Sequence, residues 1–146
     1  MKKFSFSLEK VLKLRKYREQ ETKLELGRAV SALAEIERNI QLVAQERVRA
    51  AASQFDSSNS AREIFQHSLY ISRLDNTKEK LLADAAAAEL KVEEARNIFI
   101  EASRERKVLD KLKEKKQAEH KREFYREETK TLDDVASGAL ARRLAV

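Results

Sequence analysis

Apolar side chains recur along most of the chain at spacings of three, four and seven residues. In the first half the series is Leu26, Ala29, Leu33, Ile36, Ile40 and Val43, with Leu8 and Leu12 in phase upstream. In the second half two sets run together: Leu74, Leu81, Ala88, Ala95, Ala102 and Leu109, with Ile71, Ala85, Val92 and Phe99. A sustained seven-residue period is typical of helices that pair in a left-handed coiled coil.

One stretch in the middle of the chain interrupts this periodicity. Residues 53–60, SQFDSSNS, are rich in small turn-forming side chains. Immediately afterwards Ser60 and Glu63 match a capping box, in which each side chain accepts a hydrogen bond from the other residue's backbone N–H. Near the start of the chain, Ser7 is suited to cap an earlier helix. We therefore expect a helix over about 7–55, a turn over about 56–60, a helix over about 60–132 and a flexible C-terminal tail.

These elements predict an all-α fold in which two long helices form an antiparallel coiled-coil hairpin. The whole chain, 1–146, is expected to be this single domain, with the second helix longer than the first. If Ser57 marks the bend, Leu8 lies opposite roughly residue 106, and the part after about Leu112 continues without a partner helix. That part is mostly polar, so we expect it to be frayed or held by another protein.

The composition excludes most other folds. The 146 residues include no Pro, no Cys and two Gly, and 38% are charged. Sheets and long loops draw on the backbone angles that Gly and Pro supply, and a chain without Cys has neither disulfides nor thiolate zinc sites. No segment approaches the roughly 20 apolar residues of a membrane span, and the N-terminus lacks the apolar run of an export leader. We expect no direct membrane insertion.

The sequence offers no pattern for catalysis or for metal binding. It contains no Gly-rich phosphate loop and no nucleophile motif, and a pair of helices has no concavity that excludes water. His67 and His120 are the two histidines, and neither has a second ligand at a metal-binding spacing. His67 fits the helical seam, and His120 is expected to be solvated. We predict that the protein is not an enzyme, with no catalytic residues, no metal and no cofactor.

Positive charge is concentrated at the two ends of the chain. Residues 1–28 carry nine Lys/Arg against four Asp/Glu, residues 29–103 carry nine against twelve, and residues 104–146 carry thirteen against nine. An antiparallel hairpin brings both basic ends together, which would steer that end toward an acidic surface. Nucleic acid is a poor candidate for the partner, because carboxylates are interleaved with the cations and stacking aromatic residues are sparse.

The two ends also carry a family resemblance. The opening FSFSLEKVLKLRKYREQETKLELGRAV resembles the start of the FliJ proteins of bacterial flagellar export. The segment from Glu105 to Ala136, ERKVLDKLKEKKQAEHKREFYREETKTLDDVA, resembles the family's carboxy-terminal signature, a basic helix with a Leu-x-x-Leu-x-x-basic pattern that closes in Leu-Asp-Asp/Glu. The similarity covers essentially the whole chain.

This resemblance implies a cytoplasmic, non-enzymatic part of the flagellar type III protein export apparatus, needed for flagellum biogenesis and hence for motility and chemotaxis. Members of the family are similar to the coiled-coil stalk of rotary ATPases. Their paired termini enter the ring of the hexameric flagellar export ATPase, the protein links that ring to the export gate membrane protein at the flagellar basal body of the inner membrane, and it escorts export chaperones. The expected oligomeric state is a monomer.

Carried over by position, the resemblance implies two contact sites. The candidates for the ATPase ring are Phe4, Phe6, Leu8, Leu12, Arg106, Leu109, Leu112, Lys113 and Lys116. The candidates for the export gate are Tyr70, Leu74, Thr77 and Leu81. The heptad phase instead buries Leu74 and Leu81 in the seam, so the two readings conflict at these positions. The alternative function is a general structural coiled-coil scaffold, in which the same heptads pair two chains into an extended dimer.

Overall fold

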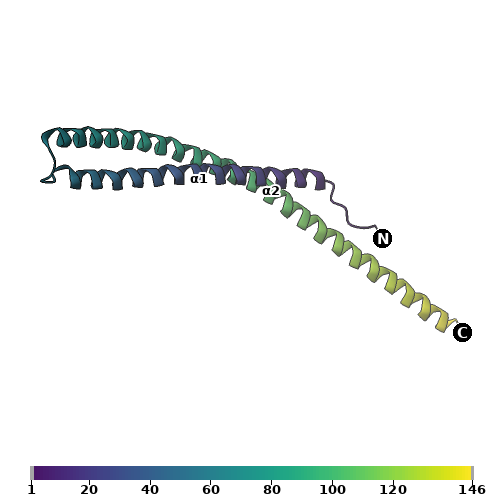
Figure 1. Ribbon diagram of the computed structural model, residues 1–146. Coiled ribbons are helices and arrows are strands. Elements are labelled where there is room, and N and C mark those ends of the chain that lie inside the picture. The colour runs from purple at the N-terminus through teal and green to yellow at the C-terminus, as the bar shows by residue number, and fades with distance from the viewer. Residues whose placement is uncertain (1, 146) are drawn as a thin grey trace. The chain divides into compact units, whose positions relative to one another are not determined.

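The computed structural model describes residues 2–145, and two helices account for nearly all of them (Figure 1). Helix α1 spans Glu9–Gln54 and helix α2 spans Ala61–Leu144. The predicted all-α hairpin with a longer second helix is confirmed. The structure starts α1 two residues after Ser7 and continues α2 well beyond the expected end near 132.

The turn between the helices is held by short-range hydrogen bonds. The Ser60 backbone N–H donates to the Glu63 carboxylate at 2.7 Å, and the Glu63 N–H donates to the Ser60 hydroxyl at 3.3 Å, so the predicted capping box is present. The Asn59 side-chain amide donates to the carbonyls of Ser53 and Gln54 at the end of α1. These bonds satisfy polar groups that a helix end leaves without intrahelical partners.

The chain forms two compact units. One, here called the turn unit, is Gln20–Glu101 and holds the turn with the adjoining parts of both helices. The other, here called the terminal unit, combines Met1–Glu19 with Ala102–Val146.

In the turn unit the two helices run antiparallel along the predicted seam. Arg47 pairs with Asp75 at 2.6 Å, and the Gln54 amide donates to the Ser68 hydroxyl at 2.6 Å. Residue numbers increase along α1 while those of the partners on α2 decrease, so the helices are antiparallel. All predicted seam positions of this unit are half-buried or buried, and its buried side chains are small: Ala50, Ala85, Ala88 and Val92. Small side chains let two helix backbones approach closely.

In the terminal unit the start of α1 lies against α2 after Ala102. Leu12 is 0% exposed and Ala102 is 3% exposed, and they are the buried apolar side chains of this unit among the described residues. The ion pairs Glu9–Lys113 and Glu19–Arg106 again show antiparallel helices. From residue 121 to 137 every side chain of α2 is exposed, as the polar sequence predicts.

The register differs from the expected one. Glu9 pairs with Lys113, whereas the sequence placed Leu8 opposite residue 106. The expectation took Ser57 as the midpoint of the bend, but the bond between Gln54 and Ser68 has residue 61 as its midpoint. The pairing is therefore centred about four residues after Ser57, and turn residues carry no heptad signal from which this offset could be read.

We predict that Ala88→Leu destabilises the turn unit by about 1–3 kcal/mol, because a larger side chain overpacks a closed seam. Ala87→Leu, one position along on an exposed face, is the matched control and should change the free energy of unfolding by less than about 0.5 kcal/mol. Urea unfolding followed by far-UV circular dichroism measures both. Equal effects of the two substitutions would contradict this description of the seam.

Candidate functional site

The nine residues predicted to contact an ATPase ring all belong to the terminal unit. Four come from the N-terminal segment and the start of α1, and five come from α2 between residues 106 and 116. They lie on two segments far apart in sequence, and the antiparallel pairing brings these segments side by side. The structure therefore gathers the candidates into one place, and their individual environments differ.

The apolar candidates divide into buried and partly exposed side chains. Leu12 is inaccessible, while Phe4, Phe6, Leu109 and Leu112 are half-buried. Leu8 is 36% exposed. Leu12 therefore belongs to the core of this unit, because a side chain with no exposed surface makes no contact with a partner unless the unit opens.

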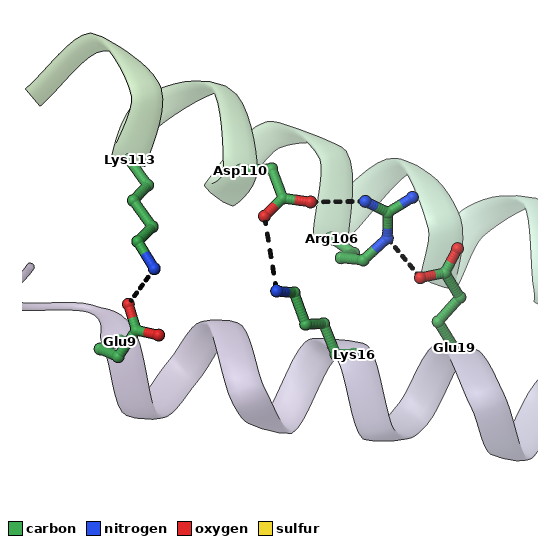
Figure 2. A network of polar contacts seen from close by, with 6 residues as sticks. All are labelled: Glu9, Lys16, Glu19, Arg106, Asp110 and Lys113. Carbon is green, nitrogen blue, oxygen red and sulfur yellow. Dashed lines mark hydrogen bonds and ion pairs between the residues drawn. The ribbon is translucent and has the colours of Figure 1, made fainter. Parts of the chain in front are cut away.

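The basic candidates are engaged in ion pairs. Arg106 is the centre of a network in which its guanidinium lies between the carboxylates of Glu19 on α1 and Asp110 on α2 (Figure 2). The Lys16 ammonium adds a longer contact to Asp110 at 4.0 Å. The Arg106 and Glu19 side chains are only 24% and 13% exposed, so these opposite charges lie in a partly dehydrated layer beside the seam.

The ion pairs of this unit change the proton affinities of their members. The carboxylate of Glu19, and then that of Asp110, raise the pKa of Arg106 above its ordinary value, so this guanidinium stays charged. The Lys113 ammonium, which donates to Glu9 at 2.8 Å, lowers the pKa of Glu9. Glu9 therefore keeps its charge to a lower pH than an isolated glutamate does, which favours its contact with Lys113.

The remaining cations give the terminal unit a strong positive surplus. It contains 20 Lys/Arg against 11 Asp/Glu, whereas the turn unit contains 11 against 14. Lys116 contacts Glu119 at 3.2 Å. Exposed lysines on the two helices of this unit include Lys10, Lys13, Lys107, Lys111 and Lys115. This unit can therefore attract an acidic surface.

His120 lies in a different environment from the one that the sequence predicted. It was expected to be solvated in a charged run, but it is half-buried against the N-terminal segment. Its Nε2 lies 3.1 Å from the Lys2 carbonyl oxygen, and its ring meets that of Phe4 edge to face with a centroid distance of 5.5 Å. The signal that could have found it is the alternation of Phe4, Ser5, Phe6 and Ser7, which is typical of an extended segment with one buried face.

The four predicted gate residues lie on α2 in the turn unit, and they split into two pairs. Leu74 and Leu81 are half-buried, in agreement with the heptad phase. Tyr70 and Thr77 are exposed. The Tyr70 hydroxyl donates to the Glu46 carboxylate at 3.1 Å, which raises the pKa of Tyr70.

Two open grooves lie on the described surface of the two units. One, of about 440 Å³, lies between the N-terminal segment and α2 around Leu112, Lys116 and His120 in the terminal unit. In the turn unit a mainly apolar groove of about 490 Å³ lies beside Ala29, Ala95 and Ile98. Among residues 2–145 there is no cluster of three or more His, Asp or Glu side chains that could hold a metal ion. No described helix is long and apolar enough to cross a bilayer.

We predict that Arg106→Met destabilises the terminal unit by roughly 1–3 kcal/mol, because it removes the guanidinium that pairs with the carboxylates of Glu19 and Asp110 in a partly dehydrated layer. Lys107→Met, at an exposed neighbouring position, is the matched control and should have little effect. Urea unfolding at neutral pH gives both values. A network that contributes nothing would make the two variants indistinguishable.

Comparison with known proteins gives one match. The sequence model of the family described as "Flagellar FliJ protein" matches residues 4–145. No curated protein and no solved structure matches the chain significantly. The family match covers both basic ends, the turn and both helices described above. The chain therefore belongs to the FliJ family of flagellar proteins.

Proposed function

We propose that this protein is the stalk of the flagellar export ATPase, with the terminal unit as the part that enters the ATPase ring. Membership of the FliJ family implies a flagellar export-related coiled-coil protein. The single observation that carries the finer proposal is the concentration of charge: the terminal unit has a surplus of nine positive charges, and the turn unit has an excess of three negative charges. A basic end is attracted to an acidic channel before it makes contact.

Within the terminal unit, some candidate residues support the proposed contact from the seam, and others would touch the ATPase ring. Leu12, Arg106 and Lys113 hold the two helices together, since they are buried or paired across the seam. Leu8 and the exposed lysines would face the ring. A contact of this kind is polar and reversible, which suits a partner that has to move against the ring surface.

The mechanism follows from a mismatch of symmetry. One asymmetric helical pair inside a ring of six equivalent subunits contacts different subunits differently. A ligand that binds two states of a subunit unequally shifts the equilibrium between them. The stalk thereby favours nucleotide binding in some subunits and release in others. It acts by differential binding, and the ATPase supplies the chemistry.

We also propose that Tyr70 and Thr77 in the turn unit bind the export gate membrane protein. They are exposed, and an aromatic side chain with a polar end is a frequent anchor of protein interfaces. Leu74 and Leu81 would support them from the seam. Escort of export chaperones and a cytoplasmic location at the basal body belong to the same proposal, and they rest on the family.

The ring contact is tested by reversing charge in the terminal unit. We expect Lys107→Glu/Lys111→Glu to raise the protein concentration that gives half-maximal stimulation of the hexameric flagellar export ATPase by about tenfold, because two attractive contacts become repulsive. Added salt should weaken the wild-type effect in the same direction. ATP hydrolysis and hexamer formation are the measurements.

The matched control reverses the same number of charges in the turn unit. Arg62→Glu/Lys80→Glu changes two exposed cations and should leave the half-maximal concentration unchanged. The stalk proposal fails if wild-type protein neither stimulates hydrolysis nor promotes hexamers. It also fails if both double variants behave alike.

The gate contact is tested separately. We predict that Tyr70→Ala weakens binding to the cytoplasmic domain of the export gate protein about tenfold, because a truncated aromatic anchor is costly. Tyr70→Phe keeps the ring, loses the bond to Glu46 and should retain most of the binding. Leu90→Ala, exposed elsewhere on α2, is the control. Unchanged binding of Tyr70→Ala in a titration would eliminate this site.

A further inference from the structure

The N-terminal segment, residues 2–8, lies against α2 beyond the point where α1 begins. In the run of α2 from 114 to 118 all side chains are exposed, then Glu119 and His120 are half-buried, and from 121 to 137 everything is exposed again. Since Glu9, the first residue of α1, already pairs with Lys113, the cover over Glu119 and His120 comes from residues 2–8.

The segment replaces a further turn of helix along the same seam. Seven residues of α2 advance about 10 Å, because each rises 1.5 Å. An extended chain reaches more than 3 Å per residue, so the few residues before Glu9 span this length easily. Phe4 and Phe6 are half-buried, and Ser5 and Ser7 between them are exposed. The segment therefore presents one apolar face to α2.

The hydrogen bond and the ring contact between this segment and α2 both lie at the far end of the segment. A hollow of about 440 Å³ remains between the segment and α2 and is lined by residues of both, including Phe6, Leu112 and Lys116, so the segment does not fill the space against α2. His120 supplies two contacts at once, one to the Lys2 backbone at 3.1 Å and one to the Phe4 ring at 5.5 Å. A carbonyl oxygen only accepts hydrogen bonds, so Nε2 must carry the proton and donate it.

We infer that His120 is a positioning residue: it anchors residues 2–8 on α2 and so presents the N-terminal part of the proposed ring contact in an ordered form. This inference rests on the proposed function for its consequence and on the contacts of His120 for its structural part. Without the anchor the segment has to be ordered when the ring binds, and that entropic cost lowers affinity. On this inference Phe4 acts through the contact between its aromatic side chain and that of His120. The sequence-based prediction was instead that Phe4 contacts the ATPase ring directly.

The structural part is tested on the free protein. The chain has no Cys, so Ser5→Cys, at an exposed position of the segment, accepts a single nitroxide label. In this otherwise wild-type protein we expect the electron paramagnetic resonance spectrum of a label with restricted motion. After His120→Ala the spectrum should be close to that of the urea-unfolded chain. Lys121→Ala, at the exposed neighbouring position, should keep the label restricted. A mobile label before any change at His120, or a restricted one in His120→Ala, overturns the inference.

Coupling to Phe4 provides an independent check of the anchor. Phe4→Ala should release the label in part, because the bond from His120 to the Lys2 carbonyl remains, and the double variant should be no more mobile than His120→Ala alone, because His120→Ala already removes the ring contact with Phe4. Urea unfolding of His120→Ala should match that of the wild type, which separates release of the segment from loss of the fold. Additive release by the two substitutions would show that they hold the segment independently, and would overturn the single-anchor description.

The functional part uses the ATPase. His120→Ala should raise the concentration for half-maximal stimulation about fivefold with an unchanged maximum, since only the ordering cost changes. If the segment is released and the half-maximal concentration stays the same, the positioning role is overturned. If the wild type does not stimulate the ATPase at all, the proposed function fails, and the label spectra still decide whether His120 is the anchor.

Discussion

The close pairing of two antiparallel helices along a narrow apolar seam is the interaction on which the rest of this structure depends. Few large side chains are buried, and alanines occupy much of the contact, including Ala85 and Ala88 in the turn unit and Ala102 in the terminal unit. A seam of this kind stabilises through many small dispersion contacts at close range. It leaves most of the charged surface available for partners, which suits a protein whose proposed role is binding.

Electrostatics then distinguishes the two units. In the terminal unit, charged groups line the seam as cross-helix pairs, and Arg106 is held between two carboxylates (Figure 2). These pairs use up only part of the positive charge, so the unit retains a surplus that the turn unit lacks. The same residue types thus serve two purposes: paired cations specify the register, and exposed ones supply attraction for an acidic partner.

The N-terminal segment shows how a seam can continue without a second helix. The seven-residue pattern of α2 extends past the start of α1, and residues 2–8 cover it with alternating aromatic side chains. His120 joins the two through one backbone and one ring contact. The proposed contact surface therefore combines a pair of helices with a non-helical segment that His120 contacts at Lys2 and Phe4.

The sequence by itself determined the helical fold, the seam positions and the turn. Strict heptad spacing allows one packing face, and the capping box of Ser60 and Glu63 is a local interaction. Of the two conflicting expectations for Leu74 and Leu81, the heptad phase agrees with their half-burial, because that phase follows from counting. Tertiary structure alone decided the register, the pairing of Lys113 and Arg106 with carboxylates of α1, and the partner of His120. Those depend on contacts between residues about a hundred positions apart, and neither periodicity nor composition carries information about which distant side chains meet.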